Sequence, residues 1–162
     1  MPAKKLVAAS PLVLALIATG CGSSSKTPTT PATHSMAGPS PSAALITTKS
    51  DKKLGTILAS GPKKLTVYLF ERDKGGMPTC TGACAQVWPP VTGTPKAAGA
   101  ANSSDFGTVK TASGQTQVTY KGHPLYRYAK DEDAEDAYGQ GLKSFGASWY
   151  ALKPSGQKVD LS

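Results

Sequence analysis

The stretch Tyr68-Leu69-Phe70-Glu71-Arg72-Asp73 returns 58 residues later as Tyr126-Arg127-Tyr128-Ala129-Lys130-Asp131. Both copies read Tyr-x-aromatic-x-x-Asp, and a tryptophan follows each of them, Trp88 after the first and Trp149 after the second. Self-similarity at a fixed offset predicts two related structural units that pack on a shared core.

A strand geometry explains the spacing within each copy. Side chains two residues apart lie on one face of a strand, so Tyr68 and Phe70 should point together while Val67 and Leu69 point to the other face. Asp73 follows the strand end, where a carboxylate commonly accepts backbone N–H groups of the next turn. We therefore interpret the shared motif residues as structural: Tyr68, Phe70, Asp73, Tyr126, Tyr128 and Asp131.

The composition predicts a small core built from aromatic rings. Leu, Ile, Val and Phe together number 27 of 162 residues, and seven of these lie in the first 17. All Phe, Tyr and Trp residues lie between Tyr68 and Tyr150, and each ring can bury about 150–250 Å². The length allows one domain with tails and excludes a large two-domain enzyme.

Short apolar runs separated by glycine-containing turns predict a mainly β fold. We expect a single antiparallel β domain over residues 45–162, made of two similar halves at about 54–91 and 106–152. A short helical insert is expected within Cys80–Val87, stopped by Pro89-Pro90, and Thr92–Ser104 is expected to be a surface loop. The expected strands are Leu54–Ala59, Leu65–Glu71, Phe106–Ala112, Thr116–Lys121, Leu125–Ala129, Ser148–Leu152 and a short one near Val159.

The N-terminus carries the features of a secretory signal. Two lysines precede the apolar run Leu6–Ala18, which is too short for a comfortable membrane span. Cys21 follows Ala18-Thr19-Gly20 and resembles the lipid-attachment site of bacterial lipoproteins. The third residue before the cysteine is Ala18, whereas Leu is commonest at this place in such sites. The alternative is an ordinary secretory signal with an unmodified Cys21.

Residues 21–44 predict a disordered stalk. This segment consists almost entirely of Ser, Thr, Pro, Gly and Ala, and such a composition cannot bury enough apolar surface to offset the entropy lost on ordering. The expected organisation is therefore a signal peptide (residues 1–20), a stalk (residues 21–44) and a β domain, held at the extracytoplasmic face of the cell membrane by a lipid on Cys21.

A set of motifs carries a family resemblance. The resemblance is carried by the repeated Tyr-x-aromatic-x-x-Asp, by Cys80-Thr-Gly-Ala-Cys84 followed by Trp88-Pro89-Pro90, by Tyr120-Lys-Gly-His-Pro-Leu-Tyr126, and by Gly139-Gln-Gly141 before Trp149-Tyr150. With these motifs the chain is similar to bacterial secreted lipoproteins with the YxFxxD repeat. This family is known as the secreted repeat of unknown function. The resemblance implies an extracytoplasmic, usually lipid-anchored protein and supplies no catalytic residues.

Cys80 and Cys84 are the two cysteines that remain after Cys21. An even count in an oxidising compartment favours a disulfide, and a spacing of four residues in a helical turn is compatible with its geometry. The alternative is a Cu(I)-binding or thiol-redox site that uses both sulfurs, because soft ligands favour that ion. Met77 and His123 are weak candidates for further metal ligands. No cofactor is expected.

Residues 131–136 place five carboxylates in six positions, followed by Tyr138-Gly-Gln-Gly141. Calcium takes oxygen ligands from such loops, but the spacing departs from the EF-hand pattern. We expect a solvated acidic turn, with calcium binding as the alternative.

The remaining features of the sequence favour a non-enzymatic protein. The sequence contains no nucleophile elbow, phosphate loop or zinc-protease motif. The formal net charge is +8, but the basic residues are scattered, so nucleic-acid binding is not expected. We expect a binding or structural module of the cell envelope, with the membrane and anionic cell-wall or surface polymers as partners. Exposed Trp88 or Trp149 would indicate stacking on sugars. The sequence does not fix the oligomeric state.

Overall fold

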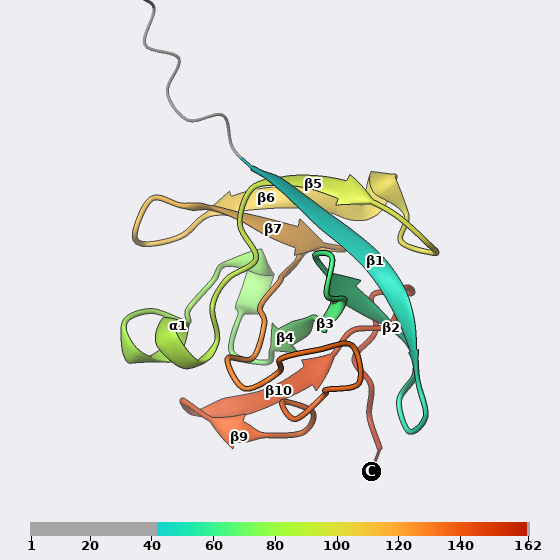
Figure 1. Cartoon of the computed structure of the whole chain (residues 1–162). Coiled ribbons are helices and arrows are strands. Elements are labelled where there is room, and N and C mark those ends of the chain that lie inside the picture. The colour runs from blue at the N-terminus through green and yellow to red at the C-terminus, as the bar shows by residue number, and fades with distance from the viewer. Residues whose placement is uncertain (1–41, 162) are drawn as a thin grey trace, which may run out of the picture. The chain divides into compact units, whose positions relative to one another are not determined.

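The computed structural model describes residues 42–161, which Figure 1 shows as a set of short strands with one short helix at the side of the domain. The predicted signal peptide, Cys21 and almost all of the predicted stalk lie outside the described residues. Within residues 42–161, no helix is long and apolar enough to cross a membrane.

Short strands dominate the described part of the chain. One α-helix, α1 (Ala83–Val87), and two single 3-10 turns, η1 (Lys74–Gly76) and η2 (Ser103–Asp105), interrupt them. The strands are β1 (Ala43–Asp51), β2 (Gly55–Ser60), β3 (Leu65–Thr66), β4 (Tyr68–Phe70), β5 (Thr94–Ala97), β6 (Phe106–Lys110), β7 (Thr116–Tyr120), β8 (His123–Pro124), β9 (Lys143–Ser144) and β10 (Ala147–Ala151).

The strands form three small sheets, ordered β3-β2-β1-β5, β4-β10-β9 and β6-β7-β8. Every pairing is antiparallel except that of β1 with β5, where Ala43 lies opposite Thr94. The first half of the domain begins with β1 and ends with β5, and β5 lies beside β1 and runs in the same direction (Figure 1).

The two halves repeat the same pairings. Thr48 of β1 lies opposite Leu58 of β2, and 60 residues later Thr108 of β6 lies opposite Val118 of β7. The β2–β3 and β7–β8 hairpins follow in the same order. The duplication in the sequence is therefore a duplication of structure.

The halves exchange their hydrogen bonds at the repeated motif. The Tyr68 N–H donates to the Tyr126 carbonyl at 2.9 Å, and the Tyr126 N–H donates to the Tyr68 carbonyl at 3.0 Å. Beyond this bridge, β4 pairs with β10 and places Phe70 opposite Trp149. In return, Tyr126 bridges Pro90, two residues after Trp88. Each tyrosine segment thus bonds to the tryptophan segment of the other half.

Stacked aromatic rings fill the space between the halves. The two indoles stack with centroids 3.9 Å apart and planes within 2°. Trp149 also stacks on Phe70 of the first motif, and Trp88 contacts Tyr128 of the second motif at a tilt of 33°. The column runs Phe70, Trp149, Trp88, Tyr128. Tyr68 and Tyr126 meet the indoles edge-on. The predicted aromatic core is confirmed.

The predicted two-faced strand is also confirmed. Tyr68 and Phe70 lie in the aromatic cluster. Val67 and Leu69 lie in a second cluster, which is mostly aliphatic, includes Leu58 and packs against the partly buried Tyr150. The alternating side chains of this one short segment therefore contribute to both clusters of the core.

The mainly β class, the antiparallel sheets, the two repeats and the short helix match the sequence prediction. Several bounds were wrong. Strand β1 begins at Ala43, inside the predicted stalk, and β5 lies in the predicted Thr92–Ser104 loop. Ala/Thr/Ser-rich β1 lacks a strong strand signature, and β5 contains a proline, which only an edge strand tolerates.

Two predicted strands are absent from the described residues. Leu125–Ala129 holds only isolated bridges of Tyr126, because its backbone N–H groups bond to three different segments, at Val118, at Tyr68 and at Val87–Pro89. Near Val159 the chain makes a single bridge between Leu152 and Lys158 rather than a strand.

Because each tyrosine segment pairs with the tryptophan segment of the other half, we predict that the two halves do not separate in native buffer. A protease site inserted between Gly99 and Ala100, both exposed, allows the connection to be cut. We expect the cut protein to elute as one species of unchanged mass, since each piece alone has unpaired strand edges and half of the indole stack. The pieces should part only in denaturant, as the uncut protein unfolds. Two pieces that separate in buffer and each keep a β spectrum would contradict the exchange.

Candidate functional site

The four polar residues shared by the two copies of the motif bond across the repeats. The Tyr68 hydroxyl donates to Asp131 Oδ2 at 2.6 Å, and the Tyr126 hydroxyl donates to Asp73 Oδ2 at 2.7 Å. Both bonds are buried. Each aspartate therefore receives the tyrosine of the other copy.

The second carboxylate oxygen of each aspartate closes the loop that follows it. Asp73 Oδ1 accepts the Thr79 N–H and hydroxyl, both at 2.7 Å, and Asp131 Oδ1 accepts the Tyr138 N–H at 3.0 Å. This confirms the predicted turn-fixing role. Sequence reasoning missed the bond to the other repeat, because equal spacing of Tyr and Asp does not reveal which pairs meet.

Burial sets the charge state of these pairs. It raises the pKa of both Tyr68 and Tyr126 far above the ordinary value, and the hydrogen bond to the partner carboxylate raises each further. Burial also raises the pKa of Asp131, against the opposing effect of the bonds from Tyr68 and Tyr138. The phenols thus stay protonated and act as donors.

Both tryptophans are fully buried, with no exposed surface. Neither indole face is open to solvent, so the exposure that would have indicated stacking on sugars through Trp88 or Trp149 is not observed. Both indole N–H groups point to Ser144, one to its hydroxyl and one to its carbonyl, each at 3.3 Å.

Cys80 and Cys84 form the predicted disulfide, with Cα atoms 5.2 Å apart. With each sulfur bonded to the other, neither is a thiolate, so the copper and thiol-redox alternatives need this bond reduced first. Met77 is 59% exposed, and His123 lies on β8. Across residues 42–161, no three His, Cys, Asp or Glu side chains are grouped to hold a metal ion.

A lysine side chain organises the acidic segment 131–136. The buried Lys49 ammonium donates to the carbonyls of Ala134 (2.7 Å) and Asp136 (3.0 Å). Burial lowers the pKa of Lys49, while the surrounding carboxylates raise it. Asp136 Oδ2 accepts the backbone N–H of Glu132 at 2.8 Å. The loop is thus closed by its own hydrogen bonds and an internal ammonium. No local pattern predicts this role for Lys49, because it lies 85 residues from Ala134.

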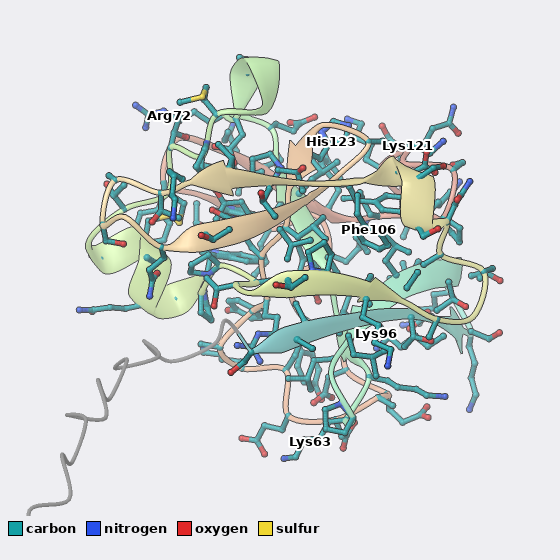
Figure 2. All side chains as sticks on the ribbon, turned by 90° about the horizontal axis from the view of Figure 1, so that it is seen from above. Lys63, Arg72, Lys96, Phe106, Lys121 and His123 are labelled. Carbon is teal, nitrogen blue, oxygen red and sulfur yellow. A yellow bond between two sulfur atoms is a disulfide. The ribbon has the colours of Figure 1, made fainter. Side chains whose placement is uncertain are left out.

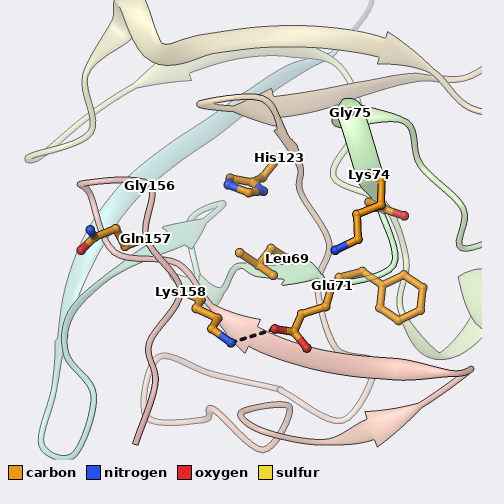
Figure 3. Close-up of a pocket in the computed structure, with 10 residues that line it drawn as sticks. Leu69, Glu71, Lys74, Gly75, His123, Gly156, Gln157 and Lys158 are labelled. Carbon is orange, nitrogen blue, oxygen red and sulfur yellow. Dashed lines mark hydrogen bonds and ion pairs between the residues drawn. The ribbon is translucent and has the colours of Figure 1, made fainter.

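The described residues also form an open pocket of about 700 Å³ beside β4. Figure 3 shows His123, Lys74 and Glu71 around its space, with Leu69 at its base. Glu71 is paired with Lys158 at 2.7 Å. The other lining residues are Phe70, Asp73, Gly75, Gly156 and Gln157.

His123 is the only pocket residue that the sequence analysis singled out for chemistry, as a weak metal candidate. Burial lowers the pKa of its imidazole, and the Asp73 charge partly opposes this effect. The ring is therefore neutral at pH 7, with one nitrogen that donates and one that accepts.

The model of a protein family described as "Secreted repeat of unknown function" matches residues 48–92 and 107–153. The chain belongs to this family. The matched ranges coincide with the two structural halves, so the resemblance noted in the sequence is confirmed, and the family places the protein outside the cytoplasm. Searches of curated proteins and of solved structures found no match.

The Tyr68–Asp131 bond predicts a stability loss when the hydroxyl is removed. Tyr68→Phe keeps the ring but leaves the buried Asp131 oxygen without its donor, at a cost of about 1–3 kcal/mol in the free energy of unfolding. Tyr126→Phe should behave alike because of the repeat symmetry. Urea denaturation measures both, and Tyr138→Phe, at an exposed ring, should remain close to the wild type. Wild-type stability of both Tyr68→Phe and Tyr126→Phe would refute the role of the crossed bonds.

The raised pKa values predict alkaline unfolding. In the unfolded chain Tyr68 and Tyr126 ionise near 10.0, whereas the folded state keeps both protonated well above that value. The stability this provides is complete below the unfolded pKa and is lost as the pH rises above it. Tyrosinate absorbance should show at least two phenols that ionise only on unfolding, and the double variant Tyr68→Phe/Tyr126→Phe should lose less stability between neutral and alkaline pH. Reversible ionisation of every tyrosine in the folded protein would contradict this expectation.

Proposed function

We propose that this protein is a non-enzymatic binding or structural module of the cell envelope, anchored to the membrane by a lipid on Cys21 and held off it by residues 21–44. The family assignment supports an envelope location. The basic start, short apolar run and Ala-Thr-Gly-Cys21 sequence support lipid attachment.

One observation carries the non-enzymatic part of the proposal. The residues that define the repeat are all used between the halves: the tyrosines and aspartates bond to each other, and the tryptophans stack in the interior. A motif that recurs in both copies and is consumed in packing is typical of a scaffold. An active site would instead present polar groups to a cavity.

The surface charge supports weak attraction to anionic envelope polymers rather than a tight electrostatic site. Removing residues 1–20 removes two lysines and no acidic residue, so the net charge falls from +8 to +6. Lys63, Lys96 and Lys121 point to solvent from separate parts of the domain (Figure 2), and Lys121 is paired with Asp105 at 3.2 Å. Spread charge of this kind favours solubility and diffuse association.

Lipid attachment predicts a membrane location that depends on one sulfur. Cys21→Ser should move the protein from the membrane fraction to a soluble fraction and abolish incorporation of labelled palmitate. The double variant Cys80→Ser/Cys84→Ser removes the other two cysteines and should stay in the membrane fraction with its label. A wild-type protein without acyl mass, or a Cys21→Ser protein that remains membrane-bound, would overturn the anchor.

A further inference from the structure

The pocket beside β4 contains hydrogen-bonding groups that the protein does not use. Neither the Lys74 ammonium nor the His123 ring has a partner within residues 42–161, and both face the space above Leu69 (Figure 3). The carboxylates in the pocket already have hydrogen-bond partners: Glu71 is paired with Lys158, and Asp73 accepts from Thr79 and Tyr126, two neutral donors that leave its negative charge in place. The unused capacity is therefore mostly donor capacity.

The duplication provides an internal comparison for this pocket. In the β2–β3 hairpin Leu65 occupies the place that His123 has in the β7–β8 hairpin, and the motif alignment puts Ala129 opposite Glu71 and Arg127 opposite Leu69. The fold thus forms with an apolar residue at the histidine position, so a histidine there is not a requirement of the scaffold.

We propose that this pocket binds a small solute through an oxyanion group, a carboxylate or a phosphate. The inference rests on the proposed function and chooses binding over a purely structural role. It does not depend on the lipid at Cys21.

The arrangement gives each group a definite part. The Lys74 ammonium supplies a positive charge that no carboxylate among residues 42–161 neutralises by direct contact. The His123 ring, on a different element, donates an N–H, and protonation would add a second charge. Leu69 offers an apolar base for the rest of the solute, and the volume suits a small molecule. Lys158 neutralises Glu71 and so reduces repulsion of the anion.

Histidine-labelled mature protein in detergent tests the proposal by nuclear magnetic resonance. The mature chain has two histidines, and His34 serves as an internal reference for His123. Inorganic phosphate and succinate are titrated separately at constant ionic strength. We expect at least one of them to shift the His123 ring signals saturably while the His34 signals stay in place. A response to one anion alone would identify the oxyanion.

Variants place the binding in the pocket. Lys74→Gln should weaken binding by about tenfold, as expected for loss of a charge-assisted bond, whereas Lys130→Gln, an equal change of charge at an exposed lysine outside the pocket, should bind as the wild type does. His123→Leu installs the residue of the other repeat and should abolish the heat of binding in calorimetry.

Three results would overturn the proposal: no saturable shift with either anion, equal shifts of His34 and His123, or unchanged affinity of Lys74→Gln. Such a failure would leave the membrane anchor and the structural role intact. Conversely, loss of the anchor in the Cys21→Ser experiment would leave anion binding standing.

Discussion

The crossed tyrosine–aspartate bonds are the constraint on which the rest of the structure depends. Tyr68 and Asp131, like Tyr126 and Asp73, come from different halves, so neither half can satisfy its own buried polar groups. An unpaired buried carboxylate or hydroxyl is costly, and this cost forces the halves together in one register. The backbone bridge between the two tyrosines and the stacked indoles then lie at the centre of the interface. Few aliphatic residues suffice, because large rings supply most of the buried area.

Much of this could be predicted from the sequence. The spacing of Tyr68 and Phe70 placed both rings on one face, the repeated offset announced two units, and the carboxylate after each strand indicated a fixed turn. The exchange between halves could not be predicted, because a single sequence shows the period of a repeat but not which segments pair. Strands β1 and β5 were missed because their form depends on tertiary pairing rather than on local apolar alternation. The role of Lys49 required a contact across 85 residues.

Duplication separates what the fold requires from what one half has added. The tyrosines, aspartates and tryptophans occur in both halves and lie in the interface. The disulfide occurs only in the first half, and the acidic loop closed by Lys49 only in the second. Each stabilises the loop that follows its own motif aspartate. Two different local solutions thus hold the same pair of crossed bonds, which indicates that loop sequence is free to vary once the aspartate is held in place.

The same separation locates the part of the domain that is free for function. A residue shared by both halves cannot change without disturbing the interface, whereas a residue present in one half is released from that constraint. His123 stands where the first half has Leu65, and Glu71 stands where the second half has Ala129. His123 thus places a polar ring in a partly buried position where the other half has an apolar side chain, and burial there lowers the pKa of the ring. That pocket position is therefore not fixed by the fold, whereas the tyrosines and aspartates that cross between the halves are.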